Sequence, residues 1–158
     1  MSETIVFVVA RDAGTRRLMT RALSRSPDVH VISMRGGAAT VAWAHAAHPA
    51  AVVIVPGAPG SAEWLLGGLL RERPETARTA LVAVVGADLG PPPCVDWTEI
   101  VTETEGHTQL VDAVRRALSH RLPAPTEVHT TTIGRSARRS RHAPERDEEH
   151  GSAWREAR

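Results

Sequence analysis

Five short runs of hydrophobic, largely β-branched residues are spaced along the first part of the chain. They span residues 4–10, 29–34, 51–55, 79–85 and, more weakly, 98–102. Continuous apolar runs of this length are typical of strands that are covered on both faces. Turn-forming residues stand at Pro27-Asp28, ahead of the second run, and in the Pro/Gly loop 56–60, after the third. The pattern therefore predicts five strands of a buried sheet.

Amphipathic segments lie between these runs and after the last one. Their apolar residues recur at spacings of three and four, the period of a helix that buries one face. Asp12 or Thr15 can cap the first helix and Ser61 the third, while Pro49 and Pro74 follow the second and third helices. The residues expected to be buried are Leu18, Met19, Ala22 and Leu23, then Val41 and Trp43, then Trp64, Leu65, Leu66, Leu69 and Leu70, and finally Leu110, Val114, Ala117 and Leu118.

The order of these elements, strand and helix in alternation with short connections, indicates the fold class. Parallel strands joined by right-handed crossovers place helices on both faces of one sheet. We predict an α/β domain over residues 1–122, in which a five-stranded parallel sheet forms the middle layer of an α/β/α sandwich.

The chain changes character after Leu122. Residues 123–158 hold few apolar side chains and sorted blocks of charge, so they cannot bury enough surface to order themselves. We predict a disordered, charged tail. Its basic cluster, ahead of the acidic block 145–149, consists of Arg135, Arg138, Arg139 and Arg141. A solvated linker is the favoured interpretation of this cluster, and weak, salt-dependent binding to nucleic acid is the alternative.

Charge and composition narrow the function classes. Residues 1–122 hold 12 arginines and 12 acidic residues, so the folded part has no overall basic field to attract nucleic acid. All 19 basic residues are arginine, which indicates the composition bias of a high-GC genome. Without lysine the chain has neither a Schiff-base amine nor a P-loop lysine. The single cysteine, Cys94, forms no internal disulfide and completes no thiolate metal site.

Membrane and metal signals are weak in this sequence. No apolar run approaches the roughly 20 residues of a membrane span, and the run after Glu3 lacks the basic start of a signal peptide. We therefore expect a cytoplasmic protein without membrane contact. His45 and His48 could share a metal only with a third ligand, for which Asp28 or His30 could be nominated. Solvent-facing histidines are the favoured interpretation, so we predict no metal site.

The βα units that begin VFVVARDAGTRRLMTRAL and continue HPAAVVIVPGAPG resemble the receiver domain of bacterial response regulators, over roughly residues 3–121. The resemblance implies a flavodoxin-like, receiver-like sheet with strand order 2-1-3-4-5. Receiver domains carry an acidic cluster after the first strand, a phosphoryl-accepting aspartate ending the third, a Ser/Thr ending the fourth and a lysine ending the fifth. The carboxylates hold Mg²⁺, and the Ser/Thr and lysine contact the phosphoryl oxygens.

This sequence departs from that pattern at almost every position. The corresponding residues are Ala10, Arg11 and Asp12 after the first strand, Val55 after the third, Val85 after the fourth, and Thr102 or Glu103 after the fifth. Asp12 alone offers one carboxylate to a cation that needs several oxygen ligands, and Arg11 repels it. Valine has no nucleophile for a phosphoryl group. We therefore predict a degenerate phosphorylation site with no catalytic residue, no metal and no cofactor.

The connection between the fourth and fifth strands also differs from the family. Residues 87–97 are short for this connection and contain three consecutive prolines, which remove backbone donors and oppose an α-helix. We predict that the fourth helix of the family is reduced or absent. Because this face commonly makes receiver dimers and output contacts, the candidate partner contacts are Trp97, Pro91, Pro92 and Pro93.

The function expected from these features is that of an atypical receiver, or pseudo-receiver, in two-component signal transduction. It would act without phosphorylation and without catalysis, as an adaptor that binds a protein partner, a second copy of itself, or both. The alternative is a small α/β nucleotide- or ligand-binding protein or enzyme that uses the crevice at the strand ends. That alternative lacks a nucleophile with a base, a glycine fingerprint and a lysine.

Overall fold

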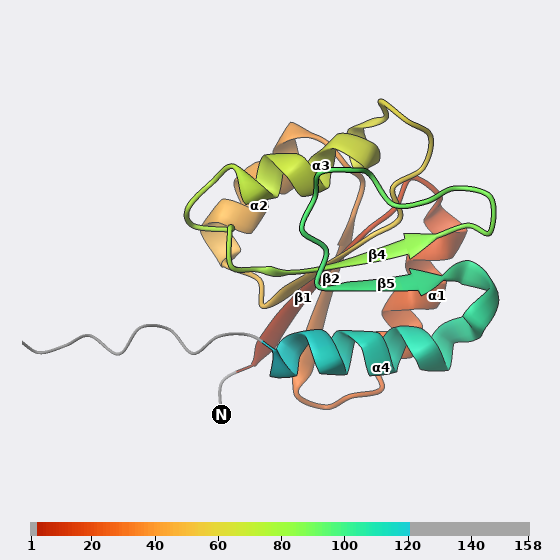
Figure 1. The fold of residues 1–158 in the computed structure, drawn as a ribbon. Helices are drawn as coiled ribbons and strands as arrows, with labels where there is room; N and C mark the ends of the chain where they lie inside the picture. Colours follow the sequence, from red (N-terminus) through yellow and green to blue (C-terminus); the bar gives the residue numbers. More distant parts are fainter. Residues whose placement is uncertain (1–2, 121–158) are drawn as a thin grey trace, which may run out of the picture. The chain divides into compact units, whose positions relative to one another are not determined.

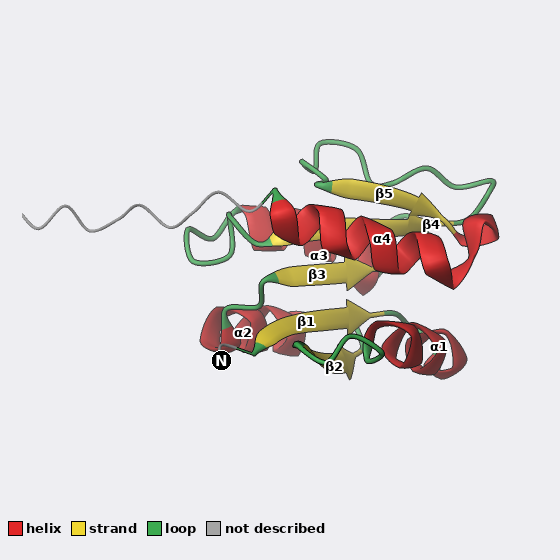
Figure 2. Ribbon diagram, turned by 90° about the horizontal axis from the view of Figure 1, so that it is seen from below, coloured by secondary structure: helices red, strands yellow, loops and turns green. Residues whose placement is uncertain are grey.

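A computed structural model describes residues 3–120 of the chain. Its centre is a five-stranded, wholly parallel sheet with the order β2-β1-β3-β4-β5, as Figures 1 and 2 show. The strands are β1 (Thr4–Val9), β2 (Val29–Met34), β3 (Ala51–Ile54), β4 (Ala80–Val85) and β5 (Glu99–Thr102). The helices are α1 (Ala13–Leu23), α2 (Ala38–Ala47), α3 (Ala62–Arg71) and α4 (Gly106–Ser119), with a 3₁₀ turn at Glu103–Glu105. The predicted α/β sandwich and its strand order are confirmed.

Helices cover both faces of the sheet, as Figure 2 shows. Alternate side chains of β1, β3 and β4 enter two separate hydrophobic cores, one on each face. On one face α1 and α4 cover Val6, Val53 and Val82. On the other, α2 and α3 cover Phe7 and Ile54. The three central strands are therefore buried on both sides, which explains their continuous apolar runs.

The connection from β4 to β5, residues 86–98, forms no helix, as the three prolines predicted. Trp97 covers this part of the sheet instead. Its indole packs against the core beneath α3, and its Nε1–H donates a hydrogen bond to the Pro92 carbonyl oxygen at 3.2 Å. A Cβ on Gly67 of α3 would lie 3.0 Å from Trp97 Cη2, so glycine is what lets the indole approach the helix this closely.

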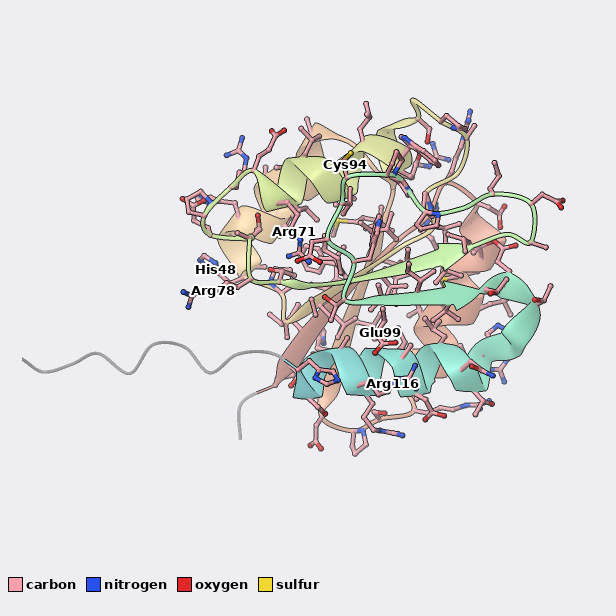
Figure 3. All side chains as sticks on the ribbon, in the orientation of Figure 1. His48, Arg71, Arg78, Cys94, Glu99 and Arg116 are labelled. Atoms are coloured by element: carbon pink, nitrogen blue, oxygen red, sulfur yellow. The ribbon has the colours of Figure 1, made fainter. Side chains whose placement is uncertain are left out.

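Two arginines connect the β4–β5 edge of the sheet to the helices α3 and α4, and both are labelled in Figure 3. Arg116 of α4 makes a two-pronged ion pair with Glu99 of β5, with N···O distances of 3.2 and 3.0 Å. Arg71, at the end of α3, donates to the carbonyl oxygens of three residues, which are Ala77 at 2.6 Å, Thr79 at 2.8 Å and Asp96 at 2.6 and 3.1 Å. Partial burial lowers the pKa of Arg71, although nearby Asp96 opposes this shift.

Several side chains expected in the core lie at the surface instead. Trp43 is 60% exposed and Leu18 is 55% exposed. Leu65 and Leu69 are exposed as well, and Trp64 is half-buried. The buried stripe of each helix is narrower than the sequence pattern indicated: Met19, Ala22 and Leu23 fill it in α1, Thr40, Val41 and Ala44 in α2, and Glu63, Leu66, Gly67 and Leu70 in α3. Residues beside such a stripe face solvent.

Among the described residues, no helix is both long enough and apolar enough to span a membrane. The predicted tail, residues 123–158, lies outside the described residues. The four arginines of its basic cluster therefore lie outside them too.

Candidate functional site

The residues that the receiver resemblance assigns to a phosphorylation site lie together at the carboxyl edge of the sheet. Val55 follows β3 beside the end of β1, since its backbone N–H donates to the Val9 carbonyl oxygen at 2.9 Å. At the end of β4, Val85 pairs with Thr102 of β5. Ala10 directly follows β1. In a parallel sheet of this kind, this edge is where ligands bind.

Asp12, the one acidic residue after β1, is used as the N-cap of α1. Its carboxylate accepts hydrogen bonds from the Thr15 backbone N–H at 2.6 Å and from the Thr15 hydroxyl at 2.9 Å. Between the two sequence candidates, Asp12 is thus the cap and Thr15 its partner. These hydrogen bonds stabilise the ionised carboxylate and lower the pKa of Asp12.

We predict a pH-dependent loss of stability for Asp12→Ala. Because the pKa of the folded state lies below the ordinary value of 3.8, the contribution of Asp12 is complete at neutral pH and fades as the pH falls through the folded value. Asp12→Ala should therefore unfold more easily than the parent at pH 7, and the gap should narrow below about pH 4. Asp12→Asn, a neutral cap, is the control. Urea titrations across this range measure the effect, and a gap that does not change with pH would contradict it.

The Arg16 guanidinium group lies over the turn after β1. It donates through Nη1 to the carbonyl oxygens of Ala10 at 2.7 Å and Arg11 at 2.8 Å. The sequence analysis missed this residue, although an arginine in the first turn of the helix after β1 was a visible signal. The positive charge of the guanidinium group beside these carbonyl oxygens repels a divalent cation. The residues present therefore do not fit the Mg²⁺ that the receiver resemblance implies.

The crevice beside Val55 is small and mostly apolar. Its cavity of about 170 Å³ is lined by side chains from the ends of β3 and β4 and from the loop after β4, among them Val55, Pro56, Val85 and Leu89. Glu103 supplies the only carboxylate in the lining. The described residues that line this cavity include no cationic side chain, and the Glu103 carboxylate repels anions, so the cavity is poorly matched to a phosphate or a nucleotide.

Of the residues predicted to contact a partner, some lie in the core and others lie at the surface. Trp97 is half-buried and packs inward, Pro92 is buried, Pro91 is half-buried and only Pro93 is exposed. Sequence reasoning did not single out Ile100, which is 52% exposed on the edge strand β5. Its β4 partner is Ala83, so it lies on the sheet face where a helix between β4 and β5 would pack.

The two histidines considered as metal ligands are His45 and His48. Both are exposed, and their ring centroids are 6.2 Å apart. Within the described residues, no group of three or more histidine, cysteine or acidic side chains is placed to share an ion.

The order of strands and the helices on both faces define a doubly wound, flavodoxin-like α/β fold. Comparison with solved structures defines the fold class more closely. The chain is similar to a sensor protein from Polaromonas sp. JS666 (14% identity, TM-score 0.65, 75% of this chain and 98% of that one). It is also similar to the response regulator domain of Thermotoga maritima CheB (16%, 0.59, 74% and 97%).

A third similar structure is the receiver domain of sensor histidine kinase PA1611 from Pseudomonas aeruginosa PAO1, which has a magnesium ion coordinated in its active site cleft (14%, 0.62, 74% and 98%). The fold of this chain is thus receiver-like. No protein-family model and no curated protein matches the sequence.

Proposed function

We propose that this chain is a response-regulator-like signalling domain that works without phosphorylation, by binding other proteins. The carboxyl edge of the receiver-like sheet carries the proposal. Val55 stands where a nucleophile is needed, and the Arg16 guanidinium covers the turn where carboxylates would hold a cation. A domain with this edge has a signalling fold, but valine stands at the position of the phosphoryl acceptor and supplies no nucleophile there.

We further propose that the domain is not an enzyme and that it acts in the cytoplasm as an adaptor. The crevice offers no nucleophile with an adjacent base, which is the usual minimum for covalent chemistry. Binding of a protein partner, or of a second copy, then falls to the outer surfaces. Exposed apolar side chains near the helix-free connection, Leu89 and Ile100, join Pro93 as contacts there, whereas Trp97 serves mainly to hold the connection.

The same proposal assigns different roles to two parts of the chain. Residues 1–122 act as the binding domain, and residues 123–158 are a charged tail. Nucleic acid is not a partner of the domain, and any binding through the tail is weak and salt-dependent.

A thermal-shift experiment on the full chain tests the proposed function. Neither millimolar Mg²⁺ with acetyl phosphate nor ATP or GTP should raise the melting temperature, because a ligand stabilises a protein only by binding its folded state. Stabilisation by the phosphodonor that requires Mg²⁺ would contradict phosphorylation independence. Stabilisation by a nucleotide alone would favour the alternative function, a small-ligand protein that uses the crevice.

A further inference from the structure

Exposed arginines follow one side of α1. Arg17 and Arg21 are four residues apart and so lie on one side of the helix, and exposed Arg25 follows just beyond its end. We call these three residues the arginine ridge. Among the described side chains, none of the three pairs with a carboxylate. Three guanidinium groups with free donors form a ready surface for anions.

Two more exposed arginines lie beyond the start of α1. Arg11 follows β1 and Arg35 follows β2, and these strand ends adjoin, since the Ala10 backbone N–H donates to the Met34 carbonyl oxygen at 3.3 Å. Neither side chain pairs with a carboxylate of the described residues. Of the nearby acids, Asp12 is engaged as the helix cap. Positive charge therefore extends from the carboxyl edge along α1.

An apolar cavity lies beside this basic surface. Leu18, next to Arg17, exposes 55% of its surface and lines a cavity of about 230 Å³ between α1 and α4. Met19, Val101 and Leu110 form its apolar wall, and Thr102, Glu103 and His107 are among its polar lining. A concave apolar surface with a few polar groups at its edge suits one large apolar side chain.

The combination of free guanidinium groups and an apolar cavity favours a peptide over a nucleic acid. Guanidinium groups pair with carboxylates and with phosphates in two-pronged geometry, so the cavity beside them decides between the two kinds of partner. Apart from the imidazole of His107, its lining holds no aromatic ring on which bases could stack. In addition, residues 1–122 carry balanced charge, so attraction is confined to this surface and does not extend over the domain.

We propose that the α1 surface binds an acidic peptide segment that carries apolar side chains. Carboxylates of the segment pair with the arginine ridge, and an apolar side chain enters the cavity beside Leu18. The inference deepens the proposed function, because it rests on the idea that the domain acts by binding protein, and it names the chemistry of the partner.

Binding of synthetic peptides to the full chain tests the proposal. The probe is a fluorescein-labelled peptide EELLEELLEELL, and its two controls are EEAAEEAAEEAA, which lacks the apolar side chains, and KKLLKKLLKKLL, which reverses the charge. Fluorescence anisotropy should show binding of the probe that weakens with salt. Both controls should bind at least about tenfold more weakly, because one removes the apolar contact and the other the ion pairs.

Variants of the full chain locate the site. Arg17→Glu with Arg21→Glu should weaken binding of the probe roughly tenfold or more, and Leu18→Ala should weaken it by about threefold or more. The matched control is Arg73→Glu with Arg78→Glu, which reverses two exposed arginines away from α1 and should leave binding unchanged. Melting curves confirm that each variant is folded.

Two results would overturn this inference: equal losses in the α1 and control variants, or a double-stranded DNA probe that binds the ridge more tightly than the acidic peptide. The peptide experiment uses no phosphodonor. If it fails while Mg²⁺ and acetyl phosphate still have no effect on the chain, the α1 inference falls and phosphorylation independence stands.

Discussion

Trp97→Ala should lower the free energy of unfolding by about 3 kcal/mol, at the lower end for a tryptophan because the indole is only half-buried. In most doubly wound domains a helix covers the sheet between the fourth and fifth strands. Here the indole of Trp97 does so. It packs beside Gly67, and its Nε1–H donates a hydrogen bond to the Pro92 carbonyl oxygen. Its removal leaves a cavity under α3 and frees the connection from β4 to β5.

Urea denaturation measures this effect, and Trp43→Ala is the matched control. Trp43 is 60% exposed, so its removal should cost less than about 0.5 kcal/mol. Equal losses for the two variants would show that Trp97 does not hold the connection. A hydrogen-exchange experiment should also show faster exchange in residues 86–98 of Trp97→Ala, because this segment has no helix of its own to protect it.

Arg71→Met should cost a similar amount, about 3 kcal/mol, since hydrogen bonds from a charged donor are worth roughly 1.5 to 3 kcal/mol and several are lost together. The arginine joins the end of α3 to the turn before β4 and to the connection before β5. Methionine keeps much of the aliphatic stem but leaves the carbonyl oxygens of Ala77, Thr79 and Asp96 without this donor.

Arg73→Met is the control for this experiment, because Arg73 is exposed two residues further along the chain. It should change the stability by less than about 0.5 kcal/mol. Arg71→Lys should be intermediate, because an ammonium group cannot span three carbonyl oxygens with the fixed fork of a guanidinium. If Arg71→Lys were as stable as the parent, the forked geometry would be irrelevant and a simple positive charge would suffice.

The two predictions concern the feature that most distinguishes this domain from a standard receiver-like fold. Trp97 and Arg71 both fasten the helix-free connection, one through its indole and the other through Asp96. A connection held in place keeps Leu89, Pro93 and Ile100 at the surface as a fixed set of contacts. If the connection were loose, ordering it would subtract from the free energy of binding the proposed partner.

The sequence predicted the sheet well because the signals for it are local. Each buried strand is a continuous apolar run, and three successive prolines exclude a helix wherever they stand. Helix faces were less well predicted. Trp43 and Leu18 are apolar residues in amphipathic segments, but periodicity marks a stripe only to within one position, and the width of the stripe depends on how the helix sits on the sheet.

The candidate site was predicted in part for a similar reason. The residues at the strand ends follow from element order, so Val55 and Val85 could be assigned without a structure. Arg71 could not, because it acts through hydrogen bonds to backbone carbonyl oxygens, and these carry no side-chain signature in the sequence. Arg16 acts in the same way, and its place in the first turn of the helix after β1 was its one visible signal. The arginine ridge was visible as a spacing of four, but whether described carboxylates pair with it depends on where those acidic residues lie in space.

Phosphorylation independence is the central claim, and an NMR comparison tests it most directly. Amide spectra of the ¹⁵N-labelled full chain are recorded with and without Mg²⁺ and beryllofluoride, which mimics an aspartyl phosphate, and an acid-bearing receiver domain serves as the positive control. The account predicts unchanged amide signals for Asp12, Val55, Val85 and Thr102. Shifts that cluster at these residues and require both reagents would show that the carboxyl edge still binds a phosphoryl group and its metal, and would contradict the account.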